Sequence, residues 1–399
     1  MSRHTLRHGT IAIAAVAAIA AGALGFQAAA AVIGDDTGPS AVASAPVHAG
    51  PSSDNDPFGA VPGNGSSDSS SAPGAITDPW GATGQGGSRT TQATPDQLRG
   101  VVDIITTVNY DQGEAAGTGM IMSADGLVLT NNHVIEGSTS IKVTDLSTGT
   151  SYTATVVGTS PTNDIAVLRL HNASGLSVAN FGSSASVAVG DAVVGVGNAG
   201  NDAGTAASSG VVTAVNQNIT ASDGTGSSAE NLTGLIETSA GIEAGDSGGP
   251  LYAADGTIVG IDTAAHTNAR TGTTLAGYAI PIDRARTIAR QITSGVDNET
   301  IHQGLPAFLG ITIASSSAAG NGTGGVTIGG AIDGTAAARA GLTAGDTITG
   351  ANGRTIESAE ALTDTISSFR PGDRMSLTWI DAAGTSHTAT ITLGEGPAD

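Results

Sequence analysis

Short runs of β-branched and aliphatic residues, separated by turn clusters, constrain the fold of this chain more than any other feature. The runs that open the region from residue 97 to residue 292 are Val101 to Val108, Gly117 to Met122, Gly126 to Thr130, Ser140 to Val143, Thr153 to Val157 and Ile165 to Leu170. Turn-forming segments such as Ser123 to Gly126 separate them, and the first long helical pattern is Ile282 to Ile292. The pattern predicts a mainly β domain of the barrel type over residues 97–292.

A second, smaller unit is expected over residues 304–396. Ser358 can cap a helix whose apolar face would carry Leu362, Ile366 and Phe369. Four strands are expected around this helix: Leu309 to Ile313, Gly325 to Ile328, Arg374 to Ile380 and Ser386 to Leu393. This arrangement predicts a small α+β module that follows the β domain.

The N-terminal part of the chain has a different composition. Arg3 and Arg7 precede an apolar run, so residues 1–34 are predicted to be an export signal or an uncleaved membrane anchor. Residues 35–96 consist mainly of Gly, Ser, Pro, Asp and Ala, which cannot bury enough apolar area to offset the entropy of ordering, and they are expected to form a disordered linker. The protein is therefore expected to be exported, either anchored in the cell-envelope membrane and facing outward or secreted.

Charge and residue usage exclude several functions. The chain has 399 residues, a formal net charge of -21 and only 14 lysines and arginines, so nucleic acid is not an expected partner. It contains no cysteine, which removes disulfides and thiol chemistry. The histidines outside the motifs below are isolated, and we expect neither a metal nor another cofactor.

The most informative motif is Gly245-Asp246-Ser247-Gly248-Gly249-Pro250. The glycines allow a sharp turn that exposes the Ser247 hydroxyl group. They also allow the N–H groups of Gly245 and Ser247 to point at one position, as two donors must do to stabilise a developing oxyanion. The hexapeptide is therefore interpreted as a nucleophile and its oxyanion hole.

A serine nucleophile needs a histidine base that is oriented by a carboxylate. His133 lies in Thr130 to Ile135, at the end of an expected strand, and Asp164 precedes the apolar strand Ile165 to Leu170. The three residues follow the chain order His133, Asp164, Ser247, and they are predicted to form a catalytic triad.

These motifs resemble the HtrA, or DegP-like, family of serine proteases. The resemblance is carried by Gly117 to Gly137, Asn163 to Leu170, Gly195 to Asn198 and Ile236 to Thr263, together with the C-terminal module. It implies a chymotrypsin/trypsin-like fold of two six-stranded β-barrels, with His133 and Asp164 from the first barrel and Ser247 from the second, followed by a PDZ domain.

The sequence departs from the family pattern just before the serine. The family has asparagine where this chain has Asp246, and Pro-Gly where it has Ala244-Gly245. In trypsin relatives this aspartate pairs with a newly cut N-terminus. Here Asp246 either is simply solvated or requires processing near Arg99 to Val102, and no zymogen cleavage is expected because a linker precedes the domain.

Two further sets of residues are candidates for substrate contacts. Gly241, followed by Ile242, takes the position where enzymes that cleave after Lys or Arg carry an acid, so a pocket for aliphatic or small apolar side chains is expected. Phe308-Leu309-Gly310-Ile311 resembles the carboxylate-binding loop of PDZ domains, which holds a C-terminal peptide as an added strand.

Together these features predict a serine endopeptidase for unfolded or misfolded exported proteins, with C-terminal peptides bound at the PDZ domain. The alternative is a chaperone or peptide-binding adaptor that uses a protease scaffold without hydrolysis. An esterase is disfavoured because the chain has no Gly-x-Ser-x-Gly on a strand-to-helix turn. The family resemblance also implies a homotrimer, and an uncleaved N-terminal segment would add the membrane as a partner.

Overall fold

The computed structural model describes residues 89–108, 113–198, 205–221, 230–267, 274–314 and 324–398. The predicted signal or anchor (1–34) and residues 35–88 of the predicted linker lie outside these ranges. Within the described residues, no helix is long and apolar enough to cross a membrane.

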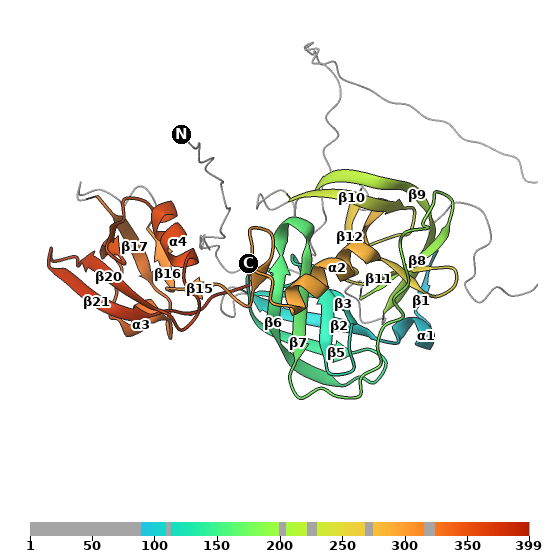
Figure 1. Cartoon of the computed structure of the whole chain (residues 1–399), viewed down its shortest axis with the longest axis horizontal. Helices are drawn as coiled ribbons and strands as arrows, with labels where there is room; N and C mark the ends of the chain where they lie inside the picture. The colour runs from blue at the N-terminus through green and yellow to red at the C-terminus, as the bar shows by residue number, and fades with distance from the viewer. Residues whose placement is uncertain are drawn as a thin grey trace, which may run out of the picture. The chain divides into compact units, whose positions relative to one another are not determined.

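The first β-barrel contains the strands expected from the opening apolar runs (Figure 1). Its strands are β2 (Val101–Val108), β3 (Gly113–Ile121), β4 (Leu127–Thr130), β5 (Ser138–Asp145), β6 (Ser151–Ser160) and β7 (Ile165–Leu170). The strand order β6-β5-β2-β3-β4-β7 closes into a barrel because β6 also pairs with β7. A short strand from further along the chain, β14 (His302–Gln303), also pairs with β6. The 3-10 helix η1 (Pro161–Asn163) leads into β7.

The second barrel has the same closed arrangement. Its strands are β8 (Ala192–Gly197), β9 (Ala206–Ala221), β10 (Glu230–Thr238), β11 (Pro250–Ala253), β12 (Ile258–Thr267) and β13 (Thr274–Pro281). They follow the order β9-β10-β13-β12-β11-β8, and β8 pairs back to β9. Six paired strands thus form each closed barrel, as the trypsin-like fold requires.

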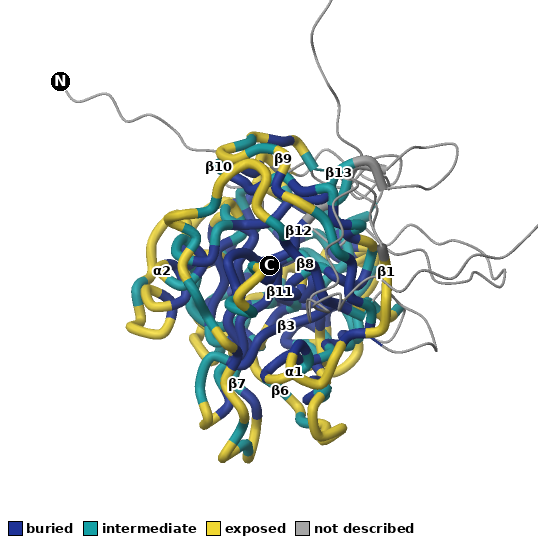
Figure 2. Tube along the Cα trace, turned by 90° about the vertical axis from the view of Figure 1, so that its right-hand side faces the viewer, coloured by how far each residue is buried: buried dark blue, intermediate teal, exposed yellow. Residues whose placement is uncertain are grey.

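Buried apolar runs explain why these strands form barrels. Apolar residues of β2, β4, β7, β8, β11 and β12 are almost fully buried. Figure 2 shows the buried stretches of the trace inside the domain and the exposed ones at its surface. Helix α2 (Ile282–Thr293) buries one face, Ile282, Ala285, Ile288, Ala289 and Ile292, and contacts β6 and β7 of the first barrel and β12 and β13 of the second.

The described chain begins before the position expected for the β domain. Residues 89–96 were predicted to belong to the disordered linker, but β1 (Arg89–Gln92) pairs with β9, and Thr94 caps the short helix α1 (Pro95–Leu98). The Thr94 hydroxyl accepts the N–H of Gln97, whose side-chain oxygen accepts the N–H of Thr94. This part of the linker prediction is therefore wrong.

The C-terminal module is the α+β unit that the sequence predicts. Its elements are β15 (Ala307–Phe308), β16 (Ile311–Ile313), β17 (Val326–Ala331), α3 (Ala336–Arg339), β18 (Thr347–Ala351), β19 (Arg354–Thr355), α4 (Ala359–Ser367), β20 (Arg374–Ile380), β21 (Ser386–Thr392) and β22 (Gly394–Glu395). The Ser358 hydroxyl caps α4 by accepting the N–H of Ala361 at 3.1 Å. In the sheet order β16-β17-β18-β20-β21, β16 is an edge strand.

Candidate active site

Asp164 is the buried anchor of the candidate site. It lies at the C-terminal end of η1 with φ 51° and is 0 % exposed. Its carboxylate accepts hydrogen bonds from the backbone N–H of His133 at 3.1 Å and from the hydroxyl of Thr263, and its carbonyl oxygen accepts the amide of Asn131 at 2.8 Å. The side chain is thereby fixed in one orientation.

The His133 ring lies next to this carboxylate, in the turn that follows β4. Its Nδ1 atom is 2.9 Å from Oδ2 and 3.0 Å from Oδ1 of Asp164. Because an ionised carboxylate can only accept, Nδ1 carries the proton and Nε2 keeps its lone pair. The side chain of His133 is 28 % exposed, so the ring can reach both the buried acid and a bound substrate.

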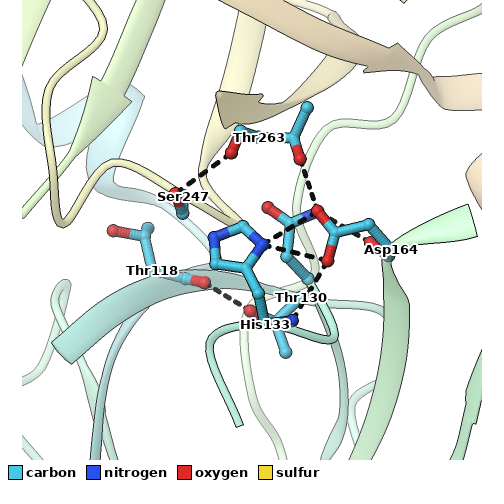
Figure 3. A network of polar contacts seen from close by, with 7 residues as sticks. Thr118, Thr130, His133, Asp164, Ser247 and Thr263 are labelled. Carbon is cyan, nitrogen blue, oxygen red and sulfur yellow. Dashed lines mark hydrogen bonds and ion pairs between the residues drawn. The ribbon is translucent and has the colours of Figure 1, made fainter. Parts of the chain in front are cut away.

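Ser247 comes from the second barrel, in the loop between β10 and β11. Figure 3 shows its hydroxyl group and Asp164 on opposite sides of the His133 ring. The Ser247 hydroxyl donates a long hydrogen bond of 3.4 Å to the carbonyl oxygen of Thr263. Thr263 therefore contacts both Asp164 and Ser247 and ties the two barrels together at the site.

The loop that carries Ser247 is packed closely against β3. Thr118 N–H donates to the carbonyl of Ser247 at 2.8 Å, and the Thr118 hydroxyl donates to the carbonyl of Gly245 at 2.7 Å. Gly248 has φ +85°, and a Cβ there would lie 2.1 Å from the carbonyl oxygen of Thr118. Only glycine fits this contact, which explains the glycine that follows the serine.

The N–H groups of Gly245 and Ser247 make no hydrogen bond within the part of the chain that the structure describes. Their carbonyl groups, in contrast, are both held by Thr118. Two unbonded donors on a fixed loop are the arrangement that an oxyanion site needs.

Asp246 faces away from solvent and is 4 % exposed, so the alternative that it is simply solvated is wrong. Its Oδ2 accepts the N–H of Glu243 at 2.9 Å, and burial raises its pKa to about 7. Val101 and Val102, next to the cleavage position considered above, are fully buried in β2, which pairs with both β3 and β5. A new N-terminus at Val101 would require the loss of these strand contacts.

The predicted pocket residues precede the serine in the same loop. Ile242 is 1 % exposed, and its side chain fills space that Gly195 and Gly277 leave open. A Cβ at Gly195 or at Gly277 would lie 2.4 Å from an Ile242 carbon atom. Ile242 thus packs into the second barrel, and the pocket formed by Gly241 and Ile242 stays a prediction.

The predicted carboxylate-binding loop of the C-terminal module connects β15 to the edge strand β16. Gly310 has φ +81°, and the carbonyl groups of Leu309 and Gly310 accept the N–H groups of Ala337 and Ile332. The N–H groups of Leu309 and Gly310 have no hydrogen-bond partner among the described residues. Phe308 and Ile311, at the ends of this loop, belong to β15 and β16.

Sequence reasoning did not single out Thr118, Asn131 and Thr263. All three lie inside or beside the motifs that carried the family resemblance, but threonine and asparagine are common in β-rich chains. Their contacts are long-range: Thr118 and Gly245 are separated by 127 positions. The signal that could have found them is the place of Thr118 and Thr263 in strands next to the triad motifs and of Asn131 directly after β4.

Comparison with known proteins agrees with this geometry. Residues 117–261 match the trypsin-like peptidase domain, and residues 307–392 match the PDZ domain. The fold and the site thus define a trypsin-like peptidase domain joined to a PDZ domain.

The chain is 33 % identical over 314 residues to serine protease PepD of Mycobacterium tuberculosis, covering 74 % of this chain and 64 % of PepD. It is 34 % identical over 268 residues to the periplasmic pH-dependent serine endoprotease DegQ of Escherichia coli, covering 66 % of this chain and 56 % of DegQ. A solved HtrA-type protease, AlgW with a tripeptide, has 27 % identity and a TM-score of 0.44, covering 76 % of this chain and 96 % of AlgW. The chain belongs to the HtrA family, and it spans less than two thirds of the length of PepD and of DegQ.

Proposed function

We propose that this protein is a serine endopeptidase that hydrolyses peptide bonds of unfolded or misfolded exported proteins. The observation that carries the proposal is the contact of His133 Nδ1 with the buried Asp164 carboxylate at 2.9 Å, with Ser247 on the opposite side of the ring (Figure 3). This is the geometry in which a histidine can remove a proton from a serine hydroxyl.

The reaction would proceed by acyl transfer. Ser247 Oγ attacks the carbonyl carbon of the scissile peptide bond while His133 Nε2 takes its proton. The N–H groups of Gly245 and Ser247 stabilise the oxyanion, and Asp164 stabilises the imidazolium. His133 then donates the proton to the leaving amine, and a water molecule repeats the sequence on the acyl-enzyme.

The PDZ domain would bind C-terminal peptides of substrates or activators. β16 is an edge strand, so it can pair with an added peptide strand, and the N–H groups of Leu309 and Gly310 can bind the terminal carboxylate. Binding there would concentrate unfolded chains near the protease domain.

The second candidate function is a chaperone or adaptor without hydrolysis. The edge strand of the PDZ domain would support it, because peptide binding there does not need the triad. The complete set of Asp164 contacts favours the protease, since a binding protein has no use for a buried carboxylate that orients a histidine.

The place of action is proposed from the relatives and the N-terminal sequence. DegQ is named as a periplasmic enzyme, and Arg3 and Arg7 precede an apolar run in this chain. We infer that the protein acts outside the cytoplasm, anchored or secreted. A homotrimer is proposed from the family resemblance alone.

The test is hydrolysis of unfolded casein by the wild-type protein and by Ser247→Ala, with the cut sites mapped by mass spectrometry. The proposal predicts cleavage after aliphatic or small apolar residues in the wild type and none in the variant. Both proteins should bind the same C-terminal peptides. Peptide binding without cleavage in the wild type, even when such a peptide is present, would favour the adaptor.

A further inference from the structure

Two buried carboxyl groups near the active site have no role in the mechanism above. Asp246 is 4 % exposed and Asp262, in β12, is 0 % exposed. Among the described residues, Oδ1 of Asp246 and both carboxyl oxygens of Asp262 have no hydrogen-bond partner. A buried carboxylate that lacks partners is costly, so each of these groups needs a physical explanation.

The two groups face the same surface of β8. A Cβ at Gly195 would lie 3.0 Å from Oδ2 of Asp262, and a Cβ at Gly197 would lie 2.5 Å from Oδ1 of Asp246. Side chains two residues apart in a strand point to the same side. The two glycines of β8 therefore leave the space that these carboxyl groups occupy, side by side.

The surroundings of the pair contain more acids. Burial is the main cause that raises the pKa of both groups. The N–H of Glu243 lowers the pKa of Asp246, the negative charge of Glu243 raises it, and Asp246 raises the pKa of Asp262. No cationic group of the described chain lowers either pKa. Without a counter-ion, two buried carboxyl groups cannot both ionise at low cost.

Among the described residues, the elements packed around the pair bring no compensating charge close to it. Next to Asp262 in β12, Thr263 donates a hydrogen bond to Asp164, and Asp164 in turn contacts His133. The residue opposite Asp262 in β13 is Ala279. On the side of β8, the nearby charged group is Asp103, which accepts a hydrogen bond from Asn198 at 2.8 Å.

The pair is joined directly to the loop that holds the oxyanion donors. Asp246 lies between Gly245 and Ser247 in sequence. Asp262 N–H donates to the carbonyl of Gly249 at 2.9 Å, and Gly248 N–H donates to the carbonyl of Asp262 at 2.8 Å. Repulsion between the two carboxyl groups would therefore separate β12 from the loop.

We propose that Asp262 is a positioning residue for the oxyanion hole, and that Asp246 and Asp262 must keep at least one proton between them for the loop to stay in place. The proposal rests on the proposed endopeptidase function. When the last shared proton leaves to solvent at alkaline pH, the two carboxylates repel each other, and Gly245 and Ser247 lose their alignment.

The activity test compares kcat and KM of the wild type and Asp262→Asn for a peptide substrate between about pH 5 and about pH 10. The wild type should lose kcat above neutral pH, about tenfold per pH unit once the pair is ionised. The asparagine introduced by this substitution would keep a hydrogen-bond donor and cannot ionise, so the variant should keep its kcat at alkaline pH. The acidic limb of the profile should not move.

The matched control is Asp255→Asn, at an exposed acid in the turn that precedes β12. The Asp255 side chain accepts the N–H of Thr257, and an asparagine can accept it equally well. This variant should have the wild-type pH profile. An alkaline limb that is the same in wild type and in Asp262→Asn would overturn the proposal.

A second measurement does not depend on proteolysis. The pH dependence of thermal unfolding is compared between two inactive proteins. One is the single variant Ser247→Ala, and the other is a double variant that carries both Ser247→Ala and Asp262→Asn. The raised pKa of the pair stabilises the fold at low pH, and this stabilisation is lost as pH rises through the folded pKa. As the pH rises, the double variant should lose less stability than Ser247→Ala. If the unfolding temperatures of the two proteins change with pH in parallel, the proposal is contradicted, even if no substrate is cleaved. Asp246→Asn replaces Asp262→Asn in both experiments if the latter does not fold.

Discussion

The hydroxyl group of Thr118 donates a hydrogen bond of 2.7 Å to the main-chain carbonyl of Gly245, across the boundary between the two barrels. The backbone N–H of Thr118 donates to the carbonyl of Ser247 at 2.8 Å, and its carbonyl oxygen accepts the hydroxyl of Thr130 at 2.7 Å. Thr118 thus holds the carbonyl groups of both residues whose N–H groups form the proposed oxyanion hole.

Thr118→Val removes the hydroxyl group and preserves the shape of the side chain. The carbonyl of Gly245 then loses its buried donor, and the loop loses one of the contacts that aim its N–H groups. We expect kcat to fall by about 10- to 100-fold, less than the loss of an oxyanion donor itself, with little change in KM. Thr118→Ser should restore most of the activity in steady-state peptide hydrolysis, and equal losses in both variants would argue against this role.

Asp164→Asn tests how His133 is oriented. An amide can donate to Nδ1 and so favour the wrong imidazole tautomer, and kcat should fall by about 10⁴-fold. Thr263→Val removes only the hydroxyl that donates to Asp164 and should cause a smaller loss. Steady-state kinetics of both variants measure which loss of kcat is larger. A loss in Thr263→Val as large as that in Asp164→Asn would show that Asp164 does not act mainly through His133.

Asp246→Asn should change how stability depends on pH. The folded pKa of Asp246 is about 7 and its ordinary value is 3.8, so its contribution to stability is fully present below 3.8 and is lost as pH rises to about 7. This difference corresponds to about 4 kcal/mol at most. Urea unfolding of both proteins across this pH interval measures it. The wild type should lose more stability than the variant, and equal losses would contradict the raised pKa.

Gly310→Ala should destabilise the PDZ domain more than Gly341→Ala. The two glycines have similar φ values, +81° and +82°, so alanine is strained at both. A Cβ at Gly310 would lie 2.2 Å from the Cβ of Thr335, whereas nothing lies within 4 Å at Gly341. Overpacking should add about 1–3 kcal/mol at Gly310. Thermal unfolding of the two variants measures the difference, and equal destabilisation would contradict the close contact.

The sequence predicted the elements whose signals are local. The barrel strands follow from short runs of β-branched and aliphatic residues between turn clusters, α4 follows from the cap at Ser358, and Gly248 follows from the turn at the serine. His133 and Asp164 were assigned to the triad from short motifs beside strands; the structure brings them within 2.9 Å of each other, and their catalytic role stays a prediction.

The features that were missed depend on contacts between distant segments. Arg89–Gln92 has no apolar pattern and forms β1 only because β9 offers a partner. Thr118 and Thr263 look ordinary in sequence, and their roles follow from the packing of β3 and β12 against the serine loop. The packing of Ile242 also depends on distant segments, because glycines at positions 195 and 277 leave the space that its side chain fills.

The most direct test of the central claim is labelling with a fluorophosphonate, which reacts with a serine only when a base activates it. The wild type, His133→Ala and Ser247→Ala are incubated with the reagent in the presence of unfolded casein, and the adduct is located by mass spectrometry. A single adduct at Ser247 that disappears in both variants would establish that His133 activates Ser247. An adduct at another serine, equal labelling of His133→Ala, or no adduct in the wild type would contradict the account.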